Sequence, residues 1–170
     1  MELPKRKNIR LKNYDYSQNG AYFITVCTKD RRHFWGEIAV GADSISARMK
    51  LNNAGQMIDK ILRVTITEFS NIRMSMYVIM PNHILMIIEI ARADMESAPT
   101  ISVIVQSFKR NTTIKYIDGV KSGIYKPFNK NIWQRGYHDH IIRNEDEYLK
   151  IWQYIDENPF KWAEDKYYCD

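Results

Sequence analysis

Two apolar runs separated by a proline-containing turn constrain the fold of this chain of 170 residues more than any other feature. The runs cover residues 74–80 and 83–90, and Pro81 and Asn82 stand between them. Proline and asparagine favour turns, and apolar runs of this length bounded by turn residues are typical of strands. The stretch therefore predicts two neighbouring strands joined by a tight connection.

Side chains on the second of these strands should alternate between the two faces of a sheet. One face should carry His83, Leu85, Ile87 and Glu89, and the other Ile84, Met86, Ile88 and Ile90. A histidine at the first position of a central strand lies at the rim of the sheet. It can be held rigidly there and still meet a ligand, so His83 is a candidate functional residue.

The remaining sequence alternates between strand and helix patterns. We expect strands at 22–28 and 137–142, and a short strand or extended arm at 33–40. Helical spacing predicts helices from 54 to about 69 with Asn52 or Asn53 as N-cap, from 100 to about 117, and from 144 to 158, ahead of Pro159. Residues 91–99 and 118–131 should be loops. This order predicts one α+β domain over residues 1–170, a sandwich of a mostly antiparallel sheet with helices on its faces.

The charge balance indicates an anionic partner. The net charge is +5 and the pI is near 9.1, which is compatible with nucleic acid and also with an ordinary basic protein. Residues 1–12 form a basic arm that includes Arg10 and Lys12. Such an arm either contacts phosphates or is simply a solvated terminus.

Cysteine usage and hydropathy indicate a cytoplasmic protein. Cys27 and Cys169 have no metal-ligand or redox spacing, which is typical of a reduced compartment. No signal peptide is expected at the N-terminus, and no run approaches the 18 apolar residues of a membrane span.

Three segments together resemble one known family. They are Met80-Pro81-Asn82-His83, the stretch around Trp133-Gln134-Arg135, and Tyr154-Ile155-Asp156-Glu157-Asn158-Pro159. In this order they resemble the single-tyrosine HUH transposases, in particular the REP-associated tyrosine transposases and their insertion-sequence relatives. The opening segment 13–28 resembles the same family, so the similarity covers nearly the whole chain.

The resemblance implies a ferredoxin-like arrangement and a specific chemistry. Tyr154 would be the nucleophile that attacks single-stranded DNA, forming a phosphotyrosine link and freeing a 3′-hydroxyl. His83 and Asn158 would be ligands of a weakly bound divalent metal, Mg²⁺ or Mn²⁺. The family places a second metal-binding histidine two residues after the first, where this chain has Leu85. Leucine offers no lone pair, so the chain should bind metal weakly and cleave slowly.

Periodicity alone gives the helix 144–158 a less specific interpretation. Tyr154 and Asn158 are four residues apart and share one helical face. Ile155 and Trp152 should lie on the packed side, which leaves Tyr154 at the edge of the apolar stripe. A tyrosine there either reaches a partner with its hydroxyl or points into water.

Several other residues are candidates for DNA contacts. Lys109 and Arg110 lie on the expected helix 100–117 and either face DNA or are solvated. Trp133 and Arg135 either stack on a base and contact phosphate, or are a buried tryptophan and a surface arginine. His138 and His140 share a strand face and are expected to be structural or to face DNA, and they are the alternative metal ligands.

Three function classes follow from these observations. The first is a metal-dependent transposase that cleaves and rejoins single-stranded DNA, with hairpin or palindromic ends as its partner. The second is a DNA-binding module on the same fold with weak or lost catalysis because of Leu85. The third is a protein-interaction domain without a DNA role. Tyr154 can act in its own subunit or serve a neighbour in a homodimer, and the sequence leaves both open.

Overall fold

An antiparallel sheet with the strand order β4-β5-β1-β6 forms the centre of the molecule. The computed structural model describes residues 20–40, 47–91 and 100–169. The strands of this sheet are β1 (Gly20–Cys27), β4 (Ile72–Ile79), β5 (His83–Ile90) and β6 (His138–Ile142). The helices are α1 (Asn53–Thr67), α2 (Ile101–Lys121) and α3 (Glu145–Glu157). The predicted α+β sandwich is confirmed, with every strand pair of this sheet antiparallel.

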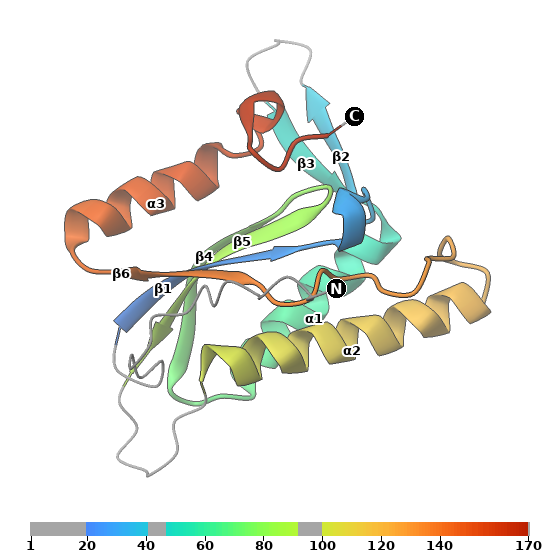
Figure 1. Ribbon diagram of the computed structural model, residues 1–170, viewed down its shortest axis with the longest axis horizontal. Helices are drawn as coiled ribbons and strands as arrows, with labels where there is room; N and C mark the ends of the chain where they lie inside the picture. The colour runs from blue at the N-terminus through green and yellow to red at the C-terminus, as the bar shows by residue number, and fades with distance from the viewer. Residues whose placement is uncertain (1–19, 41–46, 92–99, 170) are drawn as a thin grey trace, which may run out of the picture.

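Figure 1 shows the sheet between two helical layers, with α1 and α2 on one face and α3 on the other. The larger apolar cluster fills the space under α1 and α2, and its sheet residues include Tyr22, Ile24, Ile84 and Met86. A smaller cluster lies under α3 and contains Leu85, Ile87 and Ile155. The chain therefore follows the order strand, helix, strand, strand, helix, strand around the sheet, and α3 covers its second face.

The turn at Pro81 and Asn82 joins β4 and β5 as predicted. Ile79 pairs with Ile84, and the Met80 N–H donates to the His83 carbonyl at 2.8 Å. The expected alternation along β5 is confirmed, because Ile84 and Ile88 belong to the cluster under α1 and α2 while Leu85 and Ile87 belong to the cluster under α3. His83 thus begins its strand on the α3 side.

Asn52 caps α1, as one of the two predicted alternatives. Its Oδ1 accepts from the Gly55 N–H at 2.9 Å, which satisfies a backbone donor that the first helical turn leaves free. Gly55 is required for packing here, since a Cβ at this position would lie 2.1 Å from the Trp35 carbonyl oxygen. This close approach attaches α1 to the segment that follows β1.

Two element predictions were incomplete. The arm at 33–40 contains β2 (Gly36–Val40), and a partner strand that was not predicted, β3 (Ala47–Leu51), pairs with it in a separate two-stranded sheet. Helix α2 continues to Lys121 rather than ending near residue 117, and the Tyr125 ring packs against Gly119 in this last part of the helix. The basic arm 1–12, with Arg10 and Lys12, and almost all of the loop 91–99 lie outside the described residues.

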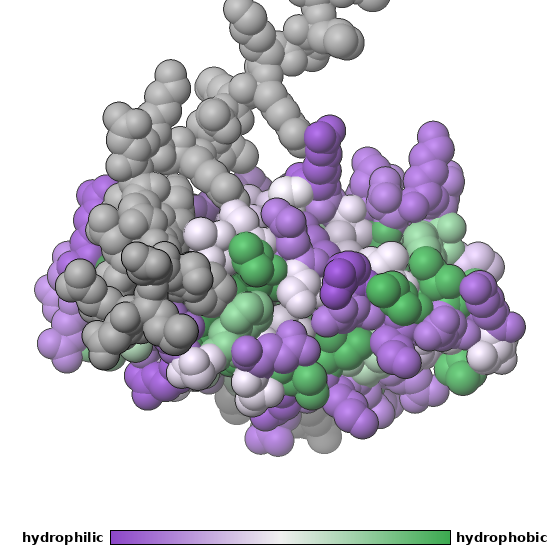
Figure 2. Space-filling view, turned by 90° about the horizontal axis from the view of Figure 1, so that it is seen from below, coloured by the Kyte–Doolittle hydropathy of each residue, from purple (hydrophilic) through white to green (hydrophobic). Residues whose placement is uncertain are grey.

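Figure 2 views the molecule from the α2 side and shows apolar residues as small separate patches among hydrophilic ones. Val103, Ile114 and Ile124 are exposed by 49%, 51% and 62%. Scattered exposed apolar residues are normal for a protein surface. Within the described residues, no helix is both long and apolar enough to cross a membrane.

Candidate active site

His83 is fully buried between aromatic rings at the start of β5. The Tyr167 ring lies 4.7 Å from it and the Trp162 ring 5.9 Å, as measured between ring centroids. Both rings belong to the segment 159–169, which follows α3 and returns across the end of the sheet. Burial lowers the pKa of His83 to about 4, and nearby Asp165 opposes this shift. The imidazole is therefore neutral at pH 7.

Asn82 sets the orientation of the His83 ring. The Asn82 Nδ2 donates to the Tyr167 carbonyl at 2.8 Å, so its Oδ1 is left to accept from His83 Nδ1 at 2.9 Å. With Nδ1 carrying the proton, Nε2 carries the lone pair. Nε2 has no hydrogen-bond partner among the described residues.

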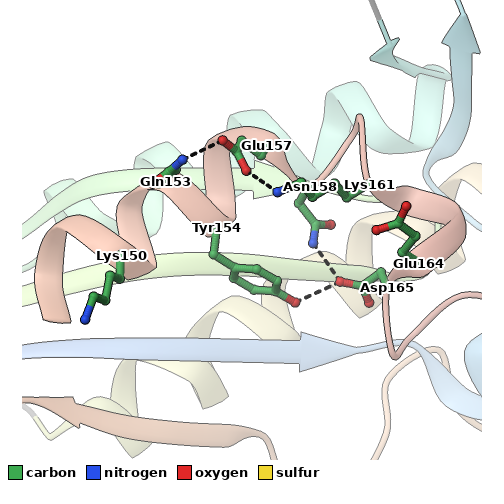
Figure 3. Close-up of a pocket in the computed structure, with 8 residues that line it drawn as sticks. All are labelled: Lys150, Gln153, Tyr154, Glu157, Asn158, Lys161, Glu164 and Asp165. Carbon is green, nitrogen blue, oxygen red and sulfur yellow. Dashed lines mark hydrogen bonds and ion pairs between the residues drawn. The ribbon is translucent and has the colours of Figure 1, made fainter.

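Helix α3 presents Tyr154 and Asn158 to the same carboxylate (Figure 3). The Tyr154 hydroxyl donates to Asp165 Oδ2 at 2.8 Å, and Asn158 Nδ2 donates to the same oxygen at 2.6 Å. The shared helical face that the spacing predicted is confirmed. Asn158 is buried, and its Oδ1 has no hydrogen-bond partner within the described part of the chain.

Tyr154, Asn158 and Asp165 line a pocket of about 360 Å³ between α3 and the segment 159–169. Its rim carries charges of both signs, including Lys150, Lys161 and Glu164. The Tyr154 ring packs edge-on against the Phe23 ring of β1, with the ring centroids 6.0 Å apart. The tyrosine is thus fixed on the sheet while its hydroxyl faces the pocket.

Electrostatics at this site keep Tyr154 protonated and Asp165 ionised. Burial and the hydrogen bond to Asp165 raise the pKa of Tyr154 well above its usual value. Burial would raise the pKa of Asp165, but hydrogen bonds from the Tyr167 N–H, Asn158 and Tyr154 lower it overall. A neutral phenol therefore faces a carboxylate anion.

Leu85 lies on the same face of β5 as His83 and is fully buried. It packs with Cys27, Ile87, Ile142 and Ile155 under α3. Position 85, where the resemblance to HUH transposases would place a second histidine, is therefore part of the apolar core in this chain. Among the described residues, no group of three or more His, Cys, Asp or Glu side chains is arranged to hold a metal ion.

The structure corrects the predictions for Trp152 and Lys109 and decides between the two alternatives for Trp133. Trp152 is 40% exposed, because Tyr148, Ile151 and Ile155 form the stripe of α3 that faces the sheet. Trp133 is buried and its Nε1 donates to Thr112 at 3.0 Å, which agrees with the second alternative, a buried tryptophan, rather than with stacking on a base. The Lys109 ammonium donates to the carbonyls of Gln134 and Gly136. Lys109 therefore stabilises the segment before β6 and is not free to contact a DNA phosphate.

The other predicted DNA contacts remain on the surface. Arg110 and Arg135 are exposed. His138 and His140 are also exposed on the edge strand β6, and His140 Nε2 lies 2.6 Å from Glu147. His140 lies next to a carboxylate, and both histidine rings lie at the edge of the sheet. The structure therefore brings neither His138 nor His140 next to His83.

Asp165 and Trp162 are site residues that the sequence analysis did not identify. Both follow Pro159, in a stretch that carries no periodicity from which a contact could be inferred. Asn82 was identified only as a turn residue, although an amide before a buried histidine is a recognisable signal for ring orientation.

Comparisons with known proteins agree with this architecture. No protein-family model matches the sequence. The fold is similar to the solved structure of a REP-associated tyrosine transposase bound to a REP hairpin, with a TM-score of 0.62 and 21% identity over 92% of this chain and 76% of that one. In sequence, the chain is 34% identical to an uncharacterized protein of Haemophilus influenzae, over 97% of this chain and 94% of that protein. Because this identity extends over almost the whole of both proteins, the chain belongs to the same family as the Haemophilus influenzae protein.

Proposed function

We propose that the protein binds single-stranded DNA and cleaves and rejoins it through Tyr154. One observation carries this proposal: Tyr154 and Asn158 meet at Asp165, which also interacts electrostatically with His83. The residues that the family resemblance singles out come from β5 and α3, about 70 positions apart, and converge on one carboxylate. The similar fold, seen in a transposase that is bound to a DNA hairpin, supports the same class of substrate.

The chemistry is a transesterification at phosphorus. The Tyr154 oxygen forms a bond to the phosphorus while the bond from phosphorus to the 3′-oxygen breaks. The phenolic proton leaves, and the departing 3′-oxygen takes up a proton to become a hydroxyl. That hydroxyl can attack the phosphotyrosine in return, so rejoining needs no external energy source.

A divalent cation fits part of this site. His83 Nε2 and Asn158 Oδ1 are buried acceptors without donors in the described residues. An imidazole nitrogen and an amide oxygen are ligands that Mn²⁺ and Mg²⁺ accept together with water. Such a cation would polarise the phosphate, which a protonated tyrosine requires because the neutral phenol is a weak nucleophile. Leu85 contributes nothing to this set.

A second pocket supports DNA binding next to the tyrosine. It measures about 360 Å³ and is lined by Arg31, His138 and Lys166 among other residues. Tyr167 lies between this pocket and His83. The exposed side chains of Arg31 and Lys166 in this hollow are suited to the phosphates of a single strand. The exposed Arg110 and Arg135 and the residues Arg10 and Lys12 are further candidates for such contacts.

The test is covalent capture. The protein is incubated with single-stranded hairpins and Mn²⁺ and examined on a denaturing gel for a protein–DNA adduct. Tyr154→Phe should abolish the adduct and leave DNA binding nearly unchanged, because only the attacking oxygen is removed. Tyr148→Phe is the matched control, since Tyr148 lies on the same helix and also donates to a carboxylate, that of Glu89, at 2.8 Å. An adduct that persists in Tyr154→Phe would place the nucleophile elsewhere, with Tyr137 next to be tested.

A second candidate function is DNA binding without cleavage. The burial of Leu85 in the apolar cluster favours it, because that position cannot provide a metal ligand. Salt-sensitive binding of single strands without any adduct, even at high Mn²⁺ concentration, would select this candidate.

A further inference from the structure

Asp165 interacts with both His83 and Asn158, each of which carries a buried acceptor: it bonds to the Asn158 amide, and its charge acts on the His83 ring. Asn158 donates to Asp165 through Nδ2, so its unpartnered atom is the oxygen, and the bond to Asn82 leaves His83 with its lone pair on Nε2. An acceptor that is left without a donor in a protein interior destabilises the folded state. Two such buried acceptors, on residues that both interact with one carboxylate, indicate a place for a positively charged ligand.

Asp165 has the negative charge that such a ligand needs and an acceptor position that the donors among the described residues leave open. A carboxylate offers about four acceptor positions. Three donors occupy three of these positions: Tyr154 and Asn158 bond to Oδ2, and the Tyr167 N–H bonds to Oδ1 at 2.7 Å. Within the described residues, no lysine or arginine forms an ion pair with this carboxylate. Its negative charge is therefore stabilised by hydrogen bonds alone.

The segment 159–169 holds Asp165 firmly next to β5. Asn82 Nδ2 bonds to the Tyr167 carbonyl, and Arg31 donates to the Lys166 carbonyl at 3.0 Å. The Trp162 ring stacks on His83 with an angle of 29° between the planes. Asp165 is thus positioned from both sides and does not depend on a free-moving side chain.

We propose that Asp165 is the third protein ligand of the divalent cation, alongside His83 and Asn158, and that it compensates for the apolar side chain of Leu85. A carboxylate, an amide oxygen and an imidazole nitrogen with added waters form a set that suits Mn²⁺ or Mg²⁺. The inference rests on the metal-dependent chemistry proposed above. According to this inference, the segment 159–169 not only covers His83 but also supplies a ligand of the cation.

Calorimetric titration of Mn²⁺ in the absence of DNA tests this role without using activity. Asp165→Asn removes the charge but keeps an acceptor for Tyr154, so the fold should be retained, which melting without metal verifies. Loss of a ligand should weaken Mn²⁺ binding by more than the 10–100-fold that is usual for a residue behind a ligand. Glu164→Gln is the matched control, because Glu164 is an exposed neighbouring carboxylate on the same pocket, and it should bind Mn²⁺ like the wild type.

A double variant separates ligation from a purely structural role. Leu85→His combined with Asp165→Asn should recover much of the lost affinity, since the new imidazole supplies the missing ligand. Unchanged or tighter binding by Asp165→Asn would overturn the inference, because Asp165 would then only shield the site. If His83→Ala lowers the affinity in the same series, the proposed metal site stands even though Asp165 is excluded. If the wild type binds no Mn²⁺, both the inference and the metal requirement fail, and adduct formation without metal decides separately whether Tyr154 acts.

Discussion

Leu85→His should lower the stability of the metal-free protein and tighten its binding of metal. Leu85 is fully buried, and burying a leucine contributes about 1.5–3 kcal/mol. Placing an imidazole without a hydrogen-bond partner in the same space adds a cost of about 1–3 kcal/mol. The free energy of unfolding without metal should therefore fall by about 2.5–6 kcal/mol, which leaves a domain of ordinary stability marginally folded.

Binding of Mn²⁺ should restore a large part of the lost free energy of unfolding. The new imidazole shares a strand face with His83, about 6–7 Å along the strand, and adds a lone pair at the metal site. A ligand that binds only the folded state, at about 100 times its dissociation constant, stabilises it by about 2.7 kcal/mol. Urea unfolding curves with and without Mn²⁺ measure both effects in one experiment, and the rate of adduct formation should rise in parallel.

Ile87→His provides the matched control for this prediction. Ile87 lies on the same strand and face, is equally buried and belongs to the same apolar cluster, but it is two residues farther from His83. It should show a similar loss of stability without the recovery in Mn²⁺. Equal recovery in the two variants, or none in either, would refute the reasoning and direct attention to His138 and His140.

Two further predictions follow from the DNA-binding proposal. Removing residues 1–12 should weaken binding to about the same extent on all DNA sequences and make the dependence of affinity on salt shallower, and an unchanged slope would assign no phosphate contacts to the arm. Trp133→Phe should lower the free energy of unfolding by about 1–3 kcal/mol, through loss of ring volume and of the bond to Thr112, and leave the DNA affinity of the folded protein unchanged. Weaker binding of single strands by stably folded Trp133→Phe would mean that the indole does contact a base.

Local patterns in the sequence were sufficient for the central hairpin and for the helix that carries Tyr154. Pro81 and Asn82 stop one strand and begin another, and the alternation along β5 separates Leu85 from Ile84 without knowledge of the sheet. The pairing of Tyr154 with Asn158 follows from a spacing of four residues on a helix. These features depend on neighbours in sequence, which is why they could be predicted.

Features that depend on tertiary contacts could not be predicted in this way. Trp152 is apolar and is only one position from Ile151, yet one residue turns a helix by about 100° and places Trp152 outside the buried stripe. Asp165 reaches Tyr154 only because the segment 159–169 folds back over the end of β5. Nothing in the composition of that segment indicates this return.

The order of elements along the chain has a consequence for folding during synthesis. The central sheet with α1 and α2 is built from residues up to 142, whereas the cover of its second face comes from residues 145–169. Until those residues are in place, Leu85 and Ile87 lack the cover of Ile155 and Tyr167, and a nascent sheet with such a surface is prone to self-association. A chain that folds before residues 145–169 are in place would therefore expose this apolar face and leave His83 without the cover of Trp162 and Tyr167.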